Sequence, residues 1–372
     1  MNSKSNFGAV TAGILIISLL ISTAIITLTG CDIQEEPSIT PSITISGDLS
    51  ENIQEGAIDI VTSLEDTISE NAAWCGTFNL IWNDLKEIYV KQDIDFGIHS
   101  EIVDHLNKGT FTVADLSEDS YYKNHGIPTP ELKEEIEKAI KDKFDEKSDI
   151  LDEFDWSGNP LHRILYCMLK KEFEFPKVFT KLSEGTFGNN QKATYFGIDS
   201  STKKEVRNQV KVLYYNSEND FAVKLLTKQN DEVIFTVGRN EDNFLDIYNK
   251  ITEESKKYDG SYRFNEDDKL KVPHINFDLK EEIEEVEGKP FSFADGTEWE
   301  IFKAIQTIQF ELDEEGGRIK SEAAIAMKEN AIMIAEEPRN FYVDEAFTIF
   351  LIEEGRDLPY FAAKISDIDT IQ

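Results

Sequence analysis

The sequence predicts an α+β fold, with a mostly helical N-terminal region followed by large mixed or antiparallel β-sheets. Apolar residues recur at helical spacing before residue 160, whereas short β-branched and aromatic runs dominate from residue 164 onward. Aromatic residues are plentiful, with 24 Phe and 12 Tyr, which favours a packed core over disorder. Helices first and then strands with interspersed helices are typical of α+β proteins. We expect residues 56–372 to form one domain with a substantial core.

The first thirty residues have the pattern of an export signal. Lys4 is the only charged side chain before Cys31, and an uncharged apolar run extends from Val10 to Leu28. Small residues precede the cysteine in the sequence LTGC, as at the end of a secretory signal. This ending resembles a prokaryotic lipoprotein signal, which implies that Cys31 is lipidated and attaches the protein to the cell membrane. An ordinary transmembrane anchor is the alternative. Both interpretations place the remaining chain outside the cytoplasm, at the cell surface.

Residues 31–55 are rich in Ser, Thr, Pro and acidic residues, which predicts a flexible tether. The whole chain has a formal net charge of −34. Such a charge repels nucleic acid and anionic lipid headgroups, because both are bound through basic side chains. It favours solubility and cationic partners. We therefore expect an acidic, well-solvated surface and no nucleic-acid binding.

Two segments of the N-terminal region have helical spacing. Apolar side chains recur every three or four residues through most of residues 56–91. The second segment follows Pro128 and Pro130 and has the sequence ELKEEIEKAIKDKF. It has acids in its first turn and one apolar stripe, which predicts an amphipathic helix. The region 56–160 is therefore predicted to be mostly helical.

From residue 164 onward the chain is predicted to be rich in strands. The runs KATYFGI, QVKVLYY, FAVKLLT and EVIFTVG contain β-branched and aromatic residues and are separated by turn residues. The segment DNFLDIYNKITEES returns to helical spacing. It is followed by a predicted strand, LKVPHINFDL, and by KEEIEEVEG, which predicts a short acidic helix that ends at Gly288.

Nothing in the sequence supports an enzyme, a metal site or a cofactor. GxSxG, HExxH and glycine-rich phosphate loops are absent, and the five His residues have no recognised metal spacing. We expect no catalytic residue. Apart from Cys31, the chain contains Cys75 and Cys167, which could form a disulfide in an exported protein or remain as buried thiols.

The segment from Phe310 to Ile365 carries the most information. A strand-like run, TIQFELDEEGG, enters a stretch of small residues and is followed by two apolar runs, FYVDEAFTIFLIEE and LPYFAAKISDI. Upstream, VPHINFDLKEEIEEVEGKPF and QVKVLYYNSENDFAVKLLT precede it in order. Together these segments resemble serpins, the serine protease inhibitor family. The resemblance implies a serpin-like fold in which an exposed reactive loop is cleaved by a protease and then inserts into a large sheet.

The resemblance assigns roles to the residues of this loop. Small or apolar side chains must face inward at alternate hinge positions, because side chains on a strand alternate between the two faces of the sheet. Aligned on SEAAIAM, the inward set is Ser321, Ala323, Ile325 and Met327, and the outward set is Glu322, Ala324 and Ala326. The hinge glycines are Gly316 and Gly317. The scissile region is Met333, Ile334 and Ala335, with cleavage expected between Ile334 and Ala335.

Two departures from the family pattern bear on inhibition. Gly317-Arg318-Ile319-Lys320 separates the Glu-Glu-Gly motif from Ser321, and these four extra residues could form a bulge or a longer strand. Gln306 occupies the position at which serpins usually have a buried histidine.

Our leading hypothesis is a lipid-anchored, extracytoplasmic inhibitor of a serine or cysteine protease. Because no Lys or Arg flanks the expected scissile bond, the partner would be a subtilisin- or elastase-like protease with an apolar primary pocket. The alternative is a non-inhibitory, serpin-like surface lipoprotein with a binding or structural role.

Overall fold

The computed structural model describes residues 58–318 and 337–372. The predicted signal, Cys31 and the tether lie outside the described residues. Within the described ranges, no helix has both the length and the apolar character needed to cross a membrane.

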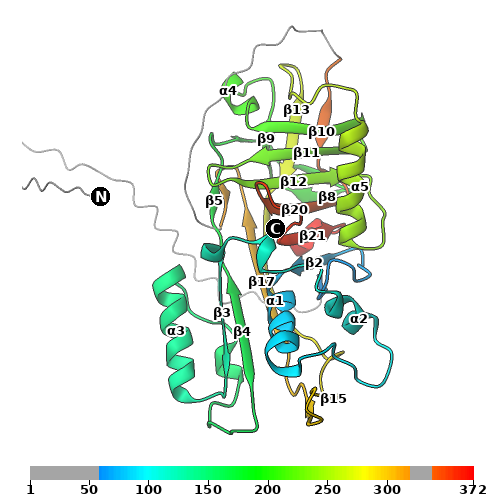
Figure 1. The fold of residues 1–372 in the computed structure, drawn as a ribbon. Helices are drawn as coiled ribbons and strands as arrows, with labels where there is room; N and C mark the ends of the chain where they lie inside the picture. The colour runs from blue at the N-terminus through cyan, green and yellow to red at the C-terminus, as the bar shows by residue number, and fades with distance from the viewer. Residues whose placement is uncertain (1–57, 319–336) are drawn as a thin grey trace, which may run out of the picture. The chain divides into compact units, whose positions relative to one another are not determined.

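The largest sheet has seven strands in the order β1-β2-β21-β20-β12-β11-β10, and all neighbours are antiparallel except β1 and β2. These strands are β1 (Asp59–Ile60), β2 (Ala72–Cys75), β10 (Val210–Ser217), β11 (Asp220–Leu226), β12 (Asp231–Val237), β20 (Phe347–Glu353) and β21 (Phe361–Ile365). Every residue of β20 is buried, as its unbroken apolar sequence predicts. Helix α5 (Phe244–Lys257) lies along this sheet in Figure 1, and its Phe244 packs against Phe350.

A second sheet packs against the first and has the order β19-β13-β9-β6. Its strands are β6 (Thr180–Lys181), β9 (Tyr195–Ile198), β13 (Lys269–Pro273) and β19 (Asn340–Tyr342). The rings of Phe341 on β19 and Phe221 on β11 lie 5.3 Å apart, so the two sheets share the main core. Strand β19 lies at the edge of the sheet and pairs in parallel with β13.

A third sheet has the order β14-β17-β18-β5, with β14 (Ile275–Glu282), β17 (Ile305–Leu312), β18 (Gly316–Gly317) and β5 (Phe173–Glu174). The described residues also form three two-stranded sheets: β3 (Tyr121–Gly126) with β4 (Ile164–Leu169), β7 (Gly185–Phe187) with β8 (Gln191–Ala193), and β15 (Pro290–Ser292) with β16 (Glu298–Glu300). Strand β4 leads into β5 after only three residues. Figure 1 shows β3, β4 and β17 at the same end of the fold as α1 and α3.

Among the residues that the structure describes, the helices besides α5 are α1 (Thr77–Asp84), α2 (Glu101–Lys108), α3 (Pro130–Phe144) and α4 (Lys204–Arg207). A π-helical turn, Leu85–Val90, continues α1. Helix α3 begins where the sequence predicts, because Thr129 accepts a hydrogen bond from the Leu132 amide and Pro130 occupies the first turn. Its buried Ile136 and Ile140 pack with Tyr166 of β4 in a small separate core. Short 3-10 turns span Val113–Asp115, Glu118–Ser120, Leu151–Glu153 and Ile368–Thr370.

One predicted helix is wrong in its first part, and a second predicted helix is wrong throughout. The first part of the predicted helix 56–91 forms β1, turns and β2, and only residues from Thr77 onward are helical. The spacing of its apolar residues is overridden by pairing of β2 with β21, nearly three hundred residues later in the chain. The predicted acidic helix after Leu279 is instead the end of β14 followed by turns, because β14 pairs with β17 as far as Glu282. The predicted strand LKVPHINFDL is confirmed but forms two strands, β13 and β14.

Candidate functional site

Residues 319–336 connect two different sheets, and both ends of this segment are firmly held. On the N-terminal side, β18 is part of the third sheet, between β17 and β5. On the C-terminal side, β19 is part of the second sheet, beside β13. The predicted hinge residues Gly316 and Gly317 are therefore described. The other predicted hinge and scissile residues lie outside the described ranges: Ser321, Glu322, Ala323, Ala324, Ile325, Ala326, Met333, Ile334 and Ala335.

The hinge glycines occupy a narrow position between two strands. Gly317 pairs with Leu312 on β17 and with Phe173 on β5, and both pairings are antiparallel. A Cβ atom on Gly316 would lie 2.1 Å from the Phe173 carbonyl oxygen. A Cβ atom on Gly317 would lie 2.6 Å from the Phe173 ring and 2.8 Å from the carbonyl oxygen of Glu311. Only glycine fits at these two positions without moving the neighbouring backbone.

Glu314 anchors the turn before β18. Its side chain is almost completely buried, with Oε1 2.7 Å from Lys181 Nζ and Oε2 3.0 Å from His274 Nε2. Burial alone would raise the pKa of Glu314, but the hydrogen bonds from Lys181, the backbone and His274 hold that pKa below its ordinary value. The amides of Phe175 and Phe179 donate to the carbonyls of Glu315 and Glu314. These contacts fix the entrance of the segment to β5 and to the second sheet.

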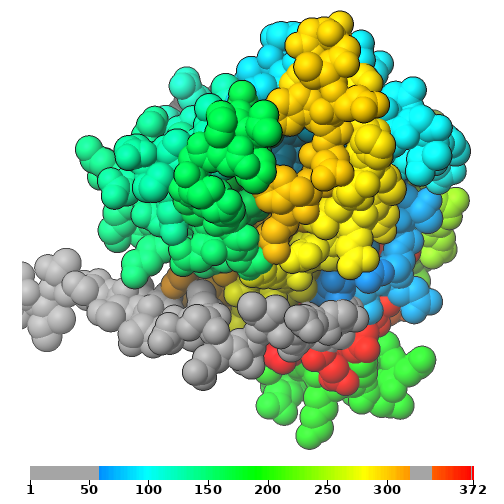
Figure 2. All heavy atoms as spheres, turned by 90° about the horizontal axis from the view of Figure 1, so that it is seen from below, coloured from blue at the N-terminus to red at the C-terminus, as the bar shows by residue number. Residues whose placement is uncertain are grey.

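A cavity of about 760 Å³ extends from β18 between β4 and β17. In the described residues, β4 pairs only with β3, and β17 has no partner on its β18 side beyond Leu312. The lining includes residues 164–171, residues 305–311 and Arg318 at the upper end, and its floor includes Phe78 and Trp82 of α1. Figure 2 shows the green segment that contains β4 and the yellow-orange segment that contains β17 on either side of this hollow. The cavity is thus bounded by the unpaired edges of β4 and β17, two strands that run in the same direction.

Gln306, at the position where the resemblance implies a buried histidine in serpins, lies on the inner wall of this cavity. It is 3% exposed, and its Nε2 donates to the Cys75 carbonyl and to Thr77 Oγ1. Its Oε1 is buried and makes no hydrogen bond with any described residue. Gln306 therefore links β17 to the residues that begin α1, and an acceptor on it stays available.

The cysteines also line the cavity, and both are free thiols. Burial raises the pKa of Cys75 to about 11 and raises the pKa of Cys167 as well. Of the two alternatives that the sequence leaves open, the structure has free thiols and no disulfide between them; Cys75 is buried and Cys167 is half-buried.

A buried charge cluster joins the upper edge of the cavity to the seven-stranded sheet. Lys171, between β4 and β5, contacts Asp231 of β12 and lies 2.9 Å from Glu353 of β20. Tyr360 donates to Asp231, and Ser117 donates to Glu353 through both its amide and its hydroxyl. Burial alone would raise the pKa of Glu353, but the Lys171 charge and the Ser117 hydrogen bonds hold that pKa below its ordinary value. The cluster fixes the β4–β5 edge to the large sheet.

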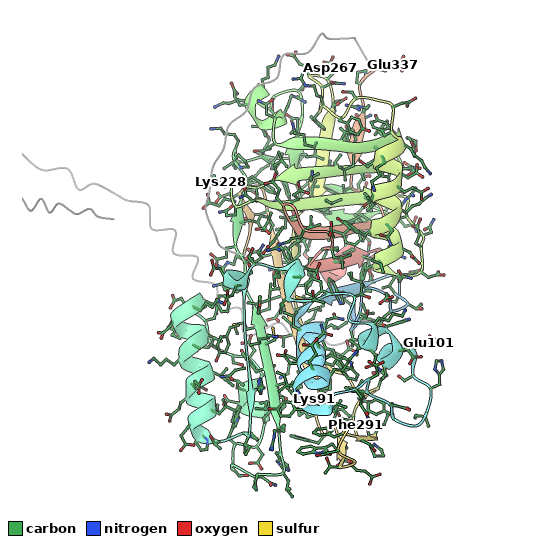
Figure 3. All side chains as sticks on the ribbon, viewed as in Figure 1. Lys91, Glu101, Lys228, Asp267, Phe291 and Glu337 are labelled. Atoms are coloured by element: carbon green, nitrogen blue, oxygen red, sulfur yellow. The ribbon has the colours of Figure 1, made fainter. Side chains whose placement is uncertain are left out.

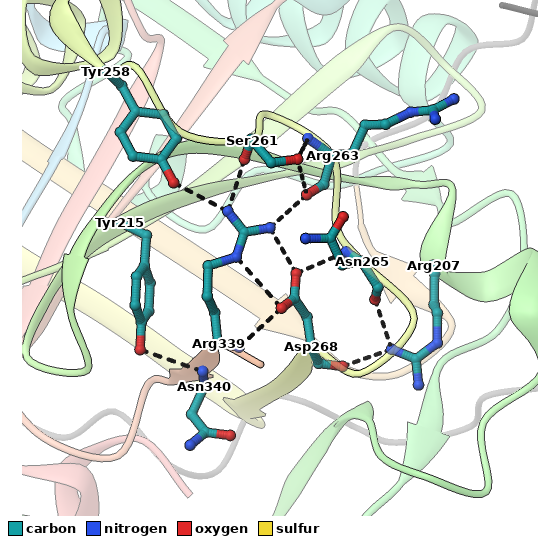
Figure 4. Close-up of polar contacts among 9 residues, drawn as sticks. All are labelled: Arg207, Tyr215, Tyr258, Ser261, Arg263, Asn265, Asp268, Arg339 and Asn340. Carbon is teal, nitrogen blue, oxygen red and sulfur yellow. Dashed lines mark hydrogen bonds and ion pairs between the residues drawn. The ribbon is translucent and has the colours of Figure 1, made fainter. Parts of the chain in front are cut away.

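At the other end of the segment, Arg339 enters a buried polar network (Figure 4). Its guanidinium contacts both carboxylate oxygens of Asp268, a residue that is completely buried. The same guanidinium donates to the Tyr258 hydroxyl and to the carbonyls of Ser261 and Arg263. Figure 3 labels Glu337, the first described residue after the gap, and Asp267, at the same end of the molecule. The network holds the start of β19 to the turn before β13.

The sequence singled out Gly316, Gly317 and Gln306 but gave no signal for Lys171, Asp231, Asp268 and Arg339. Carboxylates are too abundant for any one to be recognised from the sequence, since the chain contains 72 Asp and Glu residues. In the part of the chain that the structure describes, no group of three His, Cys, Asp or Glu residues is arranged to bind a metal ion.

No protein-family model and no curated protein matches this chain. The chain is similar to solved structures of serpins. They include the thermophilic serpin tengpin in its native state (11% identity, TM-score 0.46, 82% of this chain and 90% of that one) and serpin48 of the insect Tenebrio molitor (12%, 0.44, 80% and 92%). Human thyroxine-binding globulin in complex with its hormone is another (10%, 0.45, 79% and 91%). Serpins are also the family that the C-terminal motifs resemble.

Proposed function

We propose that this protein inhibits a protease by cleavage and insertion of the segment that begins at Gly316. One observation carries the proposal: β18 already lies between β17 and β5, antiparallel to both, and a cavity bounded by the edges of β4 and β17 continues directly below it. A strand that continued from β18 into this cavity would pair with both edges. Unpaired strand edges are templates for such addition.

The pairing of β18 determines which side chains would face inward. Continued from the Gly317–Leu312 pair, the antiparallel register brings Ser321 opposite Ile308 and Ala323 opposite Gln306. Ile308 and Gln306 are buried, whereas Thr307 and Gln309, which alternate with them along β17, are more exposed. The predicted inward set would therefore meet the buried face of β17. It contains no charge, which matters because burying an unpaired charge costs several kcal/mol.

The target and the location are further parts of the proposal. Met333, Ile334 and Ala335 would present apolar side chains to the protease, which favours a subtilisin- or elastase-like enzyme with an apolar primary pocket. Lipidation of Cys31 would hold the inhibitor at the outer surface of the cell membrane, with residues 32–55 as a tether. The LTGC sequence and the polar composition of the tether support this location.

The test is incubation of the full chain with subtilisin- and elastase-like proteases. We expect a covalent complex on denaturing gels, cleavage between Ile334 and Ala335 by mass spectrometry, and a large rise in thermal stability after cleavage. Cleavage with neither a complex nor a stability gain would contradict the inhibitory function and favour the surface-binding alternative.

A matched pair of variants separates insertion from cleavage. Ala323→Arg places a charge at an inward position and should abolish both the complex and the stability gain, while the loop is still cut. Glu322→Arg alters an outward position that is already charged and should preserve both. Equal behaviour of the two variants would show that insertion does not follow the register of β18.

A further inference from the structure

The lower end of the cavity is lined by aromatic rings that pack in a hydrophobic cluster separate from the main core. The Phe293 and Trp299 rings stack there, 4.9 Å apart and nearly parallel. Figure 2, which views the molecule from below, shows the hollow from this side, and Figure 3 labels Phe291 at the same end. We call the following residues the aromatic end of the cavity: Phe78, Trp82, Phe291, Phe293 and Trp299.

The cavity reaches the surface near the aromatic end. Leu161 and Phe302 also line it, and both side chains are exposed. Its volume of about 760 Å³ lies within the usual range of small-molecule pockets. The aromatic end is therefore accessible to a small ligand from solution.

Arg163, directly before β4, brings a cation to the aromatic end. Its Cζ lies 5.5 Å from the centroid of the Trp299 ring. Its Nη1 donates to the carbonyl oxygens of Pro160, at 2.9 Å, and His162, at 2.7 Å. Among the described residues, its Nε and Nη2 groups have no hydrogen-bond acceptor and its guanidinium has no carboxylate partner. Arg163 thus keeps charged donors free beside the cavity.

His162 supplies a second free donor. The Leu161 amide donates to Asn159 Oδ1, and this orients the Asn159 amide group so that its Nδ2 donates to His162 Nε2, at 3.1 Å. Because Nε2 accepts, the proton of the neutral imidazole lies on Nδ1. Nδ1 is buried and has no partner among the described residues. A buried donor without an acceptor costs free energy, and a carboxylate oxygen from a ligand would remove that cost.

The remaining charges near Arg163 do not neutralise it. Glu298 and Glu300 are the neighbours of Trp299 on β16, and neither forms an ion pair with Arg163. Both are exposed, so water and salt screen their charges. The free donors of His162 and Arg163 therefore favour an anionic group at this position.

The walls of the cavity favour a compact aromatic body over a long alkyl chain. Above the aromatic end, in the part of the chain that the structure describes, the cavity runs between the edges of β4 and β17. Backbone N–H and C=O groups at such edges need polar partners, which an alkyl chain does not provide. At the aromatic end, ring-to-ring contacts add to the free energy of burying apolar area. A ligand confined to the aromatic end leaves the two strand edges to water.

We propose that the aromatic end of the cavity binds a small aromatic carboxylate, with its ring against Trp299 and its carboxylate accepting hydrogen bonds from Arg163 and His162 Nδ1. These residues come from α1, β4, β16 and the turns beside them. Because none of them belongs to residues 319–336, the binding is independent of the proposed inhibition of a protease.

Isothermal titration calorimetry of the full chain with 2-naphthoate tests the ligand class. The matched alcohol, 2-naphthalenemethanol, has the same rings without the charge and should bind about 10- to 100-fold more weakly, because hydrogen bonds to charged groups are stronger. Dodecanoate has the charge without the rings and should also bind more weakly. No heat of binding from 2-naphthoate at about 1 mM overturns the proposal. An equal or higher affinity for the alcohol or for dodecanoate overturns it too.

Matched variants test the position of the ligand. Arg163→Met should weaken binding of 2-naphthoate about 10- to 100-fold and leave binding of the alcohol unchanged. Lys204→Met makes the same change in net charge at an exposed ion pair and should alter neither affinity. Equal affinities for 2-naphthoate in these two variants overturn the proposal.

Two further variants test the other contacts. His162→Phe should weaken binding of 2-naphthoate by about 3- to 10-fold, since it removes one neutral donor. Trp299→Leu removes a ring but no charge and should weaken binding of the acid and the alcohol alike. The melting temperature of each variant without ligand shows that it is folded. An affinity for 2-naphthoate that is unchanged in either variant contradicts the proposed position of the ligand.

Discussion

Arg339 and Asp268 form an ion pair at the point where the chain returns to the folded domain, with 2.7 Å between Arg339 Nη2 and Asp268 Oδ2. The Arg339 amide also donates to Asp268 Oδ1. One carboxylate therefore binds the main chain and the side chain of the same residue. This arrangement fixes the start of β19, which as an edge strand has only β13 as its partner among the described strands.

The first prediction concerns this pair. Arg339→Met leaves the carboxylate of Asp268 buried without its cation, and we expect it to lower the free energy of unfolding by about 3–5 kcal/mol. Chemical denaturation measures the loss. Lys204→Met is the control, since Lys204 and Glu266 form an exposed pair whose removal should cost less than about 1 kcal/mol. Similar losses in the two variants would contradict the role of the buried network.

The second prediction is a pH dependence caused by Glu353. Its folded-state pKa is lower than its ordinary value, so the ionised carboxylate stabilises the fold at neutral pH. That contribution is lost as the pH falls from the ordinary pKa through the folded-state pKa. Glu353→Gln should cost about 1–3 kcal/mol at pH 7 because Lys171 and Ser117 lose a charged acceptor. In more acid solution, the stability of the variant should approach that of the original protein.

Melting temperatures measured from pH 7 to pH 3 test the pH dependence assigned to Glu353. Asp231, in the same cluster, has the opposite effect on stability as the pH falls. Burial raises the pKa of Asp231, so its protonation favours the folded state. The quantity to compare is therefore the difference in melting temperature between Glu353→Gln and the original protein at each pH. A difference that stays constant over the whole range would contradict the assignment to Glu353.

Local sequence patterns predicted those helices and strands whose local preference agrees with their place in the fold. Helix α3 follows from Thr129, Pro130 and a regular apolar stripe, and β20 follows from an unbroken apolar run. The segment containing Ile58, Ile60 and Leu64 has helical spacing, but β2 beside it is drawn into the sheet by β21. A partner so distant in the chain is invisible to a periodicity argument.

The candidate site likewise has parts that the sequence indicates and parts that it does not. The hinge was predicted because the run TIQFELDEEGG, which contains Gly316 and Gly317, resembles the strand that leads into the serpin hinge. The cavity was not, because it exists only where β4 and β17 come together after folding. The Arg339–Asp268 and Lys171–Glu353 pairs likewise join residues far apart in the chain, and no spacing rule selects them from so many charged residues.

The third prediction concerns the cysteines. A thiol reacts as its thiolate, and burial raises the pKa of Cys75 to about 11. At pH 8, alkylation of Cys75 and Cys167 in the folded protein should be slower than that of free cysteine by on the order of a hundredfold. Timed iodoacetamide labelling followed by peptide mass spectrometry measures each thiol separately. Both should react fully in guanidinium chloride; rapid labelling of Cys75 without denaturant would contradict its burial.

The fourth prediction is that Gly316→Ala loosens β18, the strand that precedes residues 319–336. The new Cβ atom would lie 2.1 Å from the Phe173 carbonyl oxygen and 2.7 Å from Glu174 Cα, so β18 must move away from β5. We expect a loss of about 1–3 kcal/mol, as in other overpacked sites. Hydrogen exchange should accelerate at the amides of Phe175 and Phe179, which donate to the carbonyls just before Gly316. Gly126→Ala is the control: its Cβ atom would meet only the terminal methyl groups of Leu132, the nearer at 3.1 Å, and they can turn aside. Unchanged protection of both amides in Gly316→Ala would mean that β18 is not held between β17 and β5.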